Sequence, residues 1–386
     1  MKKLSILFVA LIISSCSSSD SSENPSTTQT DIASVDSKVT AFMNLYNIPG
    51  ASLAISKNGK LVYVKGYGKA NVASGENVTP NSRFRLASVS KTFTGVAIMK
   101  LIQDGQFTLE SNVFGTGGIL GNDYGTLPLN TNVLNMKVKH LLQHTSGSWG
   151  SATGGDVIDQ NPSYTYKQLF DWVLDTRPNP SAPGTTYDYT NVGYSLLGRI
   201  IEKASGKTYI NYIKEDVLAP IGVTLVDMAG KTEADRKANE VNYYGQGNDS
   251  AFTYTIAFPR RDADGGLISS ASDLLKLVTA VDGFTTRPDI LNAASITSFT
   301  TPSSANPSYA NGIGIWNAEN VWYNYGSLPG TRTGFMRHSN GMCVALLLNS
   351  RVDPTNGENP FVYAIQDLLL DFVNNSNYNW QNIDQF

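Results

Sequence analysis

The chain has 386 residues, of which 41% are hydrophobic and 10% aromatic. This length and composition suffice for one large or two modest folded domains and exclude disorder over most of the chain. Lysine and arginine together number 29 and aspartate and glutamate 32, so the formal net charge is −3, with no block of like charges. A nucleic-acid binder would need a basic face, which this charge pattern does not supply.

The N-terminus has the order of charges and apolar residues typical of a secretory signal. Lys2 and Lys3 precede a mostly apolar run over residues 4–13, which is too short to cross a bilayer as a helix. The Ile-Ser-Ser sequence directly before Cys16 resembles a bacterial lipobox. Residues 1–15 are therefore predicted to be a lipoprotein signal peptide, with Cys16 as the lipidated first residue. An ordinary cleaved signal followed by an incidental cysteine is the alternative.

The segment after the signal is predicted to be a flexible tether. Residues 16–31 are mainly Ser, Thr, Asn, Asp, Glu and Gln, with no large apolar side chain to bury. A single folded domain is predicted over residues 32–386. Cys343 lies in an apolar run and has no partner if Cys16 carries lipid, so no disulfide is expected. Lipidation would place the protein at the bacterial cell envelope, in the periplasm or in association with the outer membrane.

A β-hairpin is predicted near the start of the folded domain. Residues 51–56 and 61–67 have the composition of strands, and Asn58-Gly59 between them is typical of a two-residue turn. Such a turn would make Ile55 face Val62, and Leu53 face Val64, on one side of a sheet.

The remaining elements place helices between two sheet-forming ends. C-terminal strands are predicted at residues 312–316, 321–325, 333–337 and 342–349. Helices are predicted at residues 32–46, 92–103, 166–174, 194–205 and 272–281, and around a last apolar stripe of Val362, Ile365, Leu369 and Phe372. This order predicts an α/β (α+β) fold, in which an antiparallel sheet is flanked by helices and carries an inserted helical region.

The segment most informative about chemistry contains Ser88 and Lys91. Their spacing at the opening of a predicted helix puts a hydroxyl and an amine on one face. Serine becomes a nucleophile when a neighbour accepts its proton, and the helix start offers N–H groups to an oxyanion. A helix cap followed by an exposed lysine is the alternative for this motif taken alone. Ser90 is predicted to be structural, because adjacent side chains on a helix diverge.

Two more segments complete a recognisable set. Tyr189 and Asn191 are two residues apart and are predicted to share one side of an extended segment, and Asn324-Tyr325-Gly326 ends a strand at a glycine, where a substrate could lie against the backbone. Together with Ser88-x-x-Lys91, in this order, they resemble the three motifs of serine penicillin-binding proteins and class C β-lactamases. Residues 138–147, 194–202 and 265–269 also resemble stretches of this superfamily.

The resemblance implies that the nucleophile lies between an antiparallel sheet and a helical domain. By this likeness Ser88 is acylated, Lys91 and Tyr189 share the proton transfer, Asn191 orients the substrate, and the N–H groups of Ser88 and Ser327 form the oxyanion hole. Asn324, Tyr325 and Gly326 are expected to bind the substrate. No cofactor is expected.

The expected activity is that of a D-Ala-D-Ala carboxypeptidase or other D-peptidase, or of a β-lactamase-like amide hydrolase. The expected partners are peptidoglycan-like D-peptides, β-lactams or esters, together with a membrane through the lipid on Cys16. An esterase of the same fold is one alternative, and a catalytically impaired penicillin-binding or sensing protein is another. No nucleic acid is expected as a partner.

One position departs from the superfamily pattern. The third motif usually opens with Lys or His, whereas this chain has Asn324, which carries no charge. This puts in doubt the recognition of a substrate carboxylate, and Arg332 is hypothesised to supply the missing cation from the following loop. His140 and His144 are four residues apart, but no Glu follows His140 and no third ligand is evident, so no metal site is expected.

Overall fold

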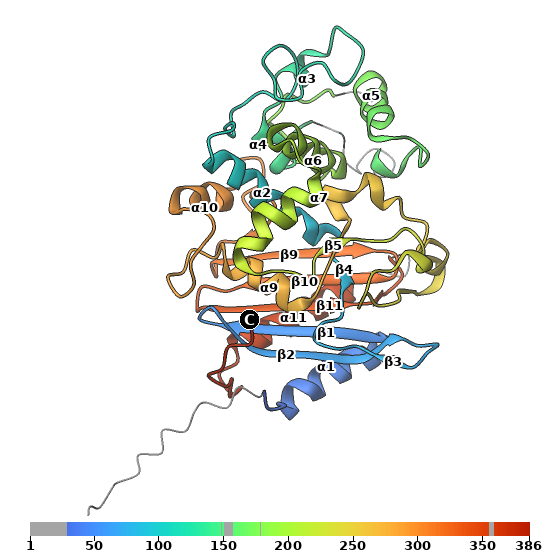
Figure 1. The fold of residues 1–386 in the computed structure, drawn as a ribbon, viewed down its shortest axis with the longest axis vertical. Coiled ribbons are helices and arrows are strands. Elements are labelled where there is room, and N and C mark those ends of the chain that lie inside the picture. Colours follow the sequence, from blue (N-terminus) through green and yellow to red (C-terminus); the bar gives the residue numbers. More distant parts are fainter. Residues whose placement is uncertain (1–28, 148, 150–156, 178, 355–358) are drawn as a thin grey trace, which may run out of the picture.

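The computed structural model describes residues 29–147, 149, 157–177, 179–354 and 359–386 (Figure 1). The predicted signal peptide, Cys16 and the tether up to residue 28 lie outside the described residues. Among the residues described, no helix combines the length and apolar character that crossing a bilayer requires.

A seven-stranded antiparallel sheet forms the base of the molecule, in the order β3-β2-β1-β11-β10-β9-β8 (Figure 1). The first hairpin joins the C-terminal strands through the pairing of β1 with β11, so the predicted sheet, completed late in the chain, is confirmed. Its strands are β1 (Gly50–Lys57), β2 (Lys60–Asn71), β3 (Glu76–Asn77), β8 (Gly314–Trp316), β9 (Val321–Leu328), β10 (Thr331–Arg337) and β11 (Met342–Leu348).

Two small sheets connect the middle of the chain to this base. The first has the order β4-β7-β5, with β4 (Phe84–Arg85), β7 (Leu267–Ser269) and β5 (Asp227–Met228). The second pairs β12 (Ser350–Arg351) with β6 (Tyr244–Gly245). Because β4 directly precedes Ser88 in the chain, its pairing with β7 fixes the approach to the predicted nucleophile.

Helices cover both faces of the large sheet, and α3, α4, α5 and α6 form the inserted region on one side of it (Figure 1). The α-helices are α1 (Ala33–Leu45), α2 (Ser90–Gln103), α3 (Thr131–Leu134), α4 (Val138–Leu142), α5 (Tyr166–Thr176), α6 (Asn191–Ser205), α7 (Tyr209–Tyr212), α8 (Asp262–Gly265), α9 (Ala271–Thr279), α10 (Ala293–Thr300) and α11 (Asn359–Asn374). Short 3-10 turns are η1 (Ala87–Val89), η3 (Val157–Asp159), η5 (Ala219–Ile221), η6 (Glu233–Asp235), η7 (Gly247–Phe252) and η8 (Phe258–Arg260), and η4 (Ile213–Leu218) is a π-helix.

Strand β11 shows how the two layers are built. Its seven residues are all buried, and its side chains alternate between two apolar clusters. One cluster packs against α1 and α11, and the other packs against α2 and α9. The side chains in the first cluster are Met342, Val344, Leu346 and Leu348, and those in the second are Cys343, Ala345 and Leu347. Burial of this strand on both faces explains its continuous apolar sequence.

The pairing of β1 with β2 differs from the predicted register. Ile55 pairs with Tyr63 instead of Val62, and Leu53 is likewise shifted from Val64. A β-bulge beside Ile55 inserts one extra residue into β2. The predicted pairs are therefore wrong by one residue, because apolar alternation and turn length do not reveal a bulge.

Asn349, directly after β11, ties the two ends of the chain together. Its side chain is fully buried, and its Oδ1 accepts a hydrogen bond of 2.7 Å from the Gly50 N–H. Its Nδ2 donates to the carbonyl oxygens of Lys69 and Asn242, each at 3.0 Å. One amide therefore satisfies backbone groups at the start of β1, within β2 and in the segment before β6.

We expect Asn349→Ala to lower the free energy of unfolding by about 2 to 4 kcal/mol, because it removes three hydrogen bonds to backbone groups, two of which are buried and one of which is part-buried. Urea denaturation measures the change. Asn317→Ala is the control, since Asn317 is exposed, and it should stay within about 0.5 kcal/mol of the wild type. Equal effects of the two substitutions would contradict this role of Asn349.

Candidate active site

Ser88 lies in the 3-10 turn η1, between β4 and α2, where it is half-buried between fully buried neighbours. Ala87, just before it, has a φ of 48°. This left-handed conformation costs a residue with a side chain about 1 to 2 kcal/mol, so the packing around the turn must hold it. Ala87 is fully buried in a cluster with Phe258, Ile268 and Leu328. The turn thus leaves the Ser88 hydroxyl accessible on a rigid base.

Lys91 is fully buried, and its amine contacts the predicted nucleophile. Its Nζ lies 3.1 Å from Ser88 Oγ, 2.5 Å from Asn191 Oδ1 and 2.7 Å from the carbonyl oxygen of Asp264. These three acceptors match the three N–H groups of an ammonium. The Nζ also lies 4.9 Å from the centroid of the Tyr189 ring, where a cation is favoured. The alternative of a helix cap followed by an exposed lysine is therefore wrong.

Tyr189 supplies a second polar hydrogen to Ser88. Its hydroxyl donates a hydrogen bond of 2.9 Å to Ser88 Oγ. The prediction that Tyr189 and Asn191 lie on one extended segment is wrong, because α6 begins at Asn191. The change of conformation sends the two side chains to different atoms, Tyr189 to Ser88 and Asn191 to Lys91. A substrate-orienting role for Asn191 stays a prediction.

His144 packs against the Tyr189 ring, with 4.2 Å between the ring centroids. Its Nδ1 accepts a hydrogen bond from the Thr190 N–H at 3.1 Å. Burial and the nearby Lys91 charge hold the pKa of His144 well below its usual value, so the imidazole is neutral. His144 therefore fixes the loop that carries the phenol.

The other histidine of the pair is engaged separately. His140 Nδ1 accepts a hydrogen bond of 3.1 Å from the Lys137 N–H. Within the described part of the chain, no group of three or more His, Cys, Asp or Glu side chains is arranged to hold a metal ion.

Asn324, on β9, faces the start of α2. Its side chain is 7% exposed, and its Nδ2 lies 3.2 Å from the Ser88 carbonyl oxygen, 3.0 Å from Thr92 Oγ1 and 3.0 Å from the Gly312 carbonyl oxygen. The amide therefore serves as a neutral donor between β9 and η1, the turn that carries the predicted nucleophile Ser88 and is called the nucleophile turn below. It takes the place in the motif that Lys or His usually holds.

Gly326 brings the backbone of β9 close to the same turn. A Cβ atom on this residue would lie 2.1 Å from the Leu86 carbonyl oxygen and 2.4 Å from Thr333 Oγ1. No larger residue fits without moving the strand away from Ser88. The structure thus explains this glycine by the closeness of the turn, and contact between its backbone and a substrate stays a prediction.

Ser327 follows on β9 and pairs with Arg332 of β10. Its hydroxyl accepts a hydrogen bond of 2.8 Å from Arg351 Nη1. Arg351 in turn forms an ion pair of 2.6 Å with Asp249. This contact holds the strand at the residue whose N–H is predicted to line the oxyanion hole.

The structure contradicts the hypothesis that Arg332 supplies a cation beside Ser88. The neighbouring Thr331 and Thr333 hydroxyls donate to the carbonyl oxygens of Arg85 and Leu86, on the side of the nucleophile turn. Because side chains alternate along a strand, Arg332 points to the opposite face. There its guanidinium carbon lies 5.8 Å from the centroid of the Tyr325 ring.

The Tyr325 side chain, predicted to bind substrate, also lies on this opposite face. It packs against the apolar cluster formed with α1 and α11. It lines a cavity of about 220 Å³ together with Ser308, Ile315, Trp316, Tyr323, Met336 and Gln366. The three residues of this motif thus do not converge, since Asn324 and Gly326 face the nucleophile turn and Tyr325 does not.

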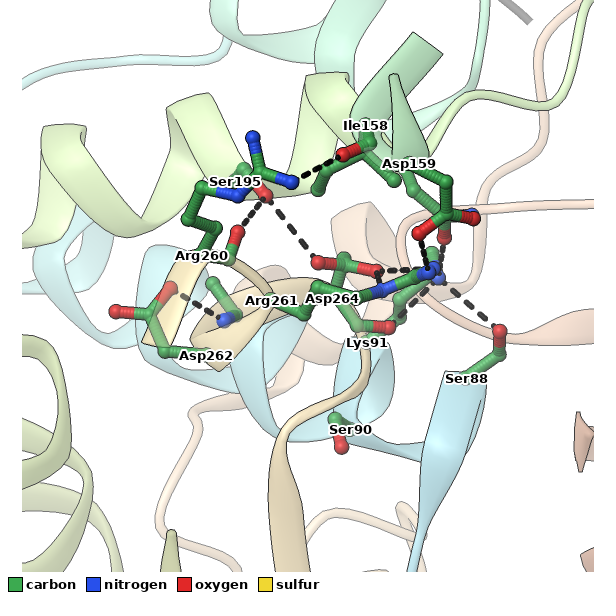
Figure 2. A network of polar contacts seen from close by, with 12 residues as sticks. Ser88, Ser90, Lys91, Ile158, Asp159, Ser195, Arg260, Arg261, Asp262 and Asp264 are labelled. Carbon is green, nitrogen blue, oxygen red and sulfur yellow. Dashed lines mark hydrogen bonds and ion pairs between the residues drawn. The ribbon is translucent and has the colours of Figure 1, made fainter. Parts of the chain in front are cut away.

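Helix α8 contributes to the site in a way that the sequence did not predict. The Asp264 carbonyl oxygen accepts a hydrogen bond from Lys91, and the Asp264 carboxylate is fully buried in a polar network with Arg261 and Ser195 (Figure 2). The signal in the sequence is a cluster of charged residues, Arg260, Arg261, Asp262 and Asp264, directly before two glycines. Charges that are buried in pairs leave no distinct periodicity, so this signal alone does not assign them a site.

Comparisons with known proteins show the family and the fold of this chain. A family model described as Beta-lactamase matches residues 35–367. Protein flp of Staphylococcus aureus (strain N315) is 31% identical over 204 residues, which are 52% of this chain and 39% of that protein. A beta-lactamase of Yersinia enterocolitica is 31% identical over 189 residues, which are 48% of this chain and 44% of that protein. The matched part thus spans less than half the length of these curated relatives.

A solved structure extends the likeness to most of the chain. The octameric penicillin-binding protein homologue from Pyrococcus abyssi aligns with a TM-score of 0.68 at 26% sequence identity. The alignment covers 88% of this chain and 77% of that one. The mixed fold, with its large antiparallel sheet and inserted helices, is therefore shared with this neighbour.

We expect Asn324→Asp to lower the free energy of unfolding by about 3 kcal/mol at neutral pH, because a carboxylate would face three oxygen atoms that now accept hydrogen bonds. The loss should shrink as the pH falls, since a protonated carboxyl can donate again. Chemical denaturation at several pH values tests both points. Asn320→Asp, at an exposed position just before β9, is the control, and a loss as large there would count against the proposed cause.

Proposed function

Because the chain belongs to the Beta-lactamase family, we propose that it is a serine hydrolase that forms an acyl-enzyme at Ser88. Its proposed substrates are amides of the D-peptide or β-lactam kind. The observation that carries the proposal is the position of one accessible hydroxyl, 3.1 Å from the Lys91 amine and 2.9 Å from the Tyr189 phenol. Such a pair can take a proton from serine and return it.

In the proposed acylation, Ser88 Oγ attacks the carbonyl carbon of the substrate and its proton passes to the pair formed by Lys91 and Tyr189. The bond between carbon and Oγ forms while the carbonyl oxygen becomes an oxyanion, for which the N–H groups of Ser88 and Ser327 are the proposed donors. The bond between carbon and nitrogen then breaks, and the pair gives its proton to the leaving amine. In the second half of the reaction, water attacks the carbonyl carbon of the ester and gives a proton to the pair. The bond between carbon and Oγ breaks, the pair returns the proton to Oγ, and the carboxylic acid leaves.

The hydrogen bonds limit how the proton moves. Tyr189 donates to Ser88 Oγ, and the Lys91 amine has an acceptor for each proton of its charged form. For Ser88 to give up its proton, one of these two groups must become an acceptor. General acid–base catalysis of this kind typically contributes about 10²- to 10⁴-fold to a rate.

An esterase is the second candidate, and the third motif favours it. Asn324 is neutral, and Arg332 faces away from Ser88. Neither residue therefore offers a positive charge to a substrate carboxylate beside the nucleophile, as a substrate ending in D-alanine would require. Esters with uncharged acyl groups do not need this charge. The same nucleophile and proton-transfer pair would act on them.

We expect Ser88→Ala to lower the rate of hydrolysis by at least about 10³-fold. The substrate is a nitrophenyl ester, nitrocefin or a D-Ala-D-Ala peptide, whichever the wild type cleaves. Tyr189→Phe should lower the rate by at least about 10²-fold, because it removes the hydroxyl beside Oγ. A fluorophosphonate or β-lactam probe should add its mass to the peptide that contains Ser88. Comparing amide and ester rates in the wild type separates the two candidates.

Ser90→Ala is the matched control for this experiment. The Ser90 hydroxyl accepts a hydrogen bond from the Leu267 N–H at 3.2 Å and is directed away from the Lys91 amine (Figure 2). Its removal should leave both labelling and turnover in place. Wild-type turnover equal to that of Ser88→Ala, with no labelled peptide, would instead favour a binding or sensing protein without turnover.

We also propose that the protein is exported and anchored by lipid on Cys16, on the basis of the N-terminal sequence. Cys16→Ser should then move the protein from the membrane fraction to the soluble fraction of the cell envelope, and metabolic labelling with a fatty acid should be lost. Cys343→Ser is the control, because Cys343 is buried in the core, and it should leave fatty-acid labelling unchanged. Unaltered fractionation of the Cys16 variant would show that the cysteine is incidental.

A further inference from the structure

A chain of charged groups runs from the surface to the back of Lys91 (Figure 2). The Asp264 carboxylate, fully buried, accepts hydrogen bonds from Arg261 Nε at 3.1 Å and Nη2 at 3.0 Å, and from Ser195 Oγ at 3.2 Å. Arg261 Nη1 forms an ion pair of 2.6 Å with Asp159. The Asp159 side chain is 61% exposed, so the chain of charges reaches solvent at that end.

The other end of this chain is the Lys91 amine. Asp264 presents its backbone carbonyl to Lys91 Nζ at 2.7 Å, while its side chain is held from behind by Arg261. Helix α8 has four residues, too few for its own hydrogen bonds to fix its position. Thr94 adds a further tie by donating to the Ala263 carbonyl oxygen at 2.7 Å. The position of the Asp264 carbonyl thus depends on these side-chain contacts.

We propose that Asp264, held by Arg261, is a positioning residue for Lys91, which fixes the direction of the amine and favours its charged form. This inference rests on the proposed hydrolase function for its catalytic consequence. The buried carboxylate belongs to the residue whose backbone carbonyl accepts a hydrogen bond from the Lys91 amine. Inside a protein, a negative charge stabilises a nearby positive charge more than it would in water. The mechanism described above does not otherwise use this carboxylate.

Four side chains that face the Lys91 amine carry no charge in the resting arrangement. Ser88 and Asn191 contact it through a hydroxyl and an amide oxygen, and the rings of Tyr189 and Tyr194 lie 4.9 Å and 5.5 Å from Nζ. His144 is neutral, as shown above. Among the described side chains named here, the Asp264 carboxylate favours the ammonium by its charge, and it also neutralises the positive charge of Arg261, its buried ion-pair partner.

Two further charged residues near α8 are engaged elsewhere. Arg260 donates to the carbonyl oxygens of Asn161 at 2.8 Å and Ile158 at 3.1 Å. Asp262 pairs with Arg199, and its Oδ1 accepts a hydrogen bond of 2.7 Å from the Ala263 N–H. Figure 2 shows the Asp262 carboxylate directed away from Lys91.

The test is the pH dependence of kcat/KM in Asp264→Asn, which keeps the size of the side chain and removes its charge. Loss of a negative charge lets the ammonium give up its proton more readily, so the limb of the profile that reports Lys91 should move to lower pH by about one unit. This direction holds whether the reaction needs the amine or the ammonium. A residue with only a structural role would lower kcat/KM at every pH and leave the limb in place.

Asp262→Asn is the matched control, because it makes the same chemical change two residues away on α8, where the carboxylate pairs with Arg199. In Asp262→Asn, the limb of the kcat/KM profile that reports Lys91 should stay at its wild-type pH. If Asp264→Asn does not fold, Asp159→Asn at the exposed end of the chain replaces it and should move the limb in the same direction by a smaller amount. An unmoved limb in the folded variant that is tested overturns the inference.

A measurement without turnover separates this inference from the hydrolase proposal. In Ser88→Ala labelled with ¹⁵N-lysine, an NMR titration follows the Lys91 amine directly, with Lys91→Arg to assign its signal. Adding Asp264→Asn should lower the pH midpoint of this titration, and adding Asp262→Asn should not. A shifted midpoint in a protein that hydrolyses no substrate would support the positioning role of Asp264 and overturn only the proposal that the protein is a hydrolase. An unshifted midpoint in an active enzyme would do the reverse.

Discussion

The burial of the Lys91 amine is the constraint on which the site depends. A charged amine removed from water is costly unless hydrogen-bond acceptors replace its hydration. Here the acceptors come from three parts of the chain, namely Ser88 three residues away, Asn191 100 residues away and Asp264 173 residues away. These contacts therefore require three helices to be in place together, namely α2, α6 and α8. The same contacts hold the amine against the Ser88 hydroxyl.

The large sheet supplies the other half of the site by binding the backbone of the nucleophile turn. Thr331 and Thr333 of β10 donate to the carbonyl oxygens of Arg85 and Leu86, and Asn324 of β9 donates to that of Ser88. Three peptide groups in the turn and just before it are thus held by strands that lie more than 200 residues later in the chain. The left-handed backbone at Ala87 persists because the strands and the buried apolar cluster over-determine it.

The face of β9 toward the turn and the face away from it have different chemistry. Toward the turn, the strand offers a neutral amide and a glycine packed against backbone. On the far face, Tyr325 lines an aromatic cavity and Arg332 lies over its ring. A family motif that usually carries a cation has here become part of the packing that fixes the nucleophile. In the proposed hydrolase, selection between amide and ester substrates would then depend on groups other than Asn324, the first residue of this motif.

The sequence by itself determined the parts that depend on local spacing. The separation of Ser88 and Lys91, the Asn58-Gly59 turn and the apolar stripes predicted the contact between these two side chains, the first hairpin and most helices, because backbone periodicity fixes which side chains share a face. Only the tertiary structure decided which face of the sheet meets Ser88, and this excluded Arg332. It also decided the bulge beside Ile55 and the contact of the Asp264 carbonyl with Lys91. A bulge and a backbone carbonyl leave no side-chain pattern in a sequence, since their positions follow from the packing of distant segments.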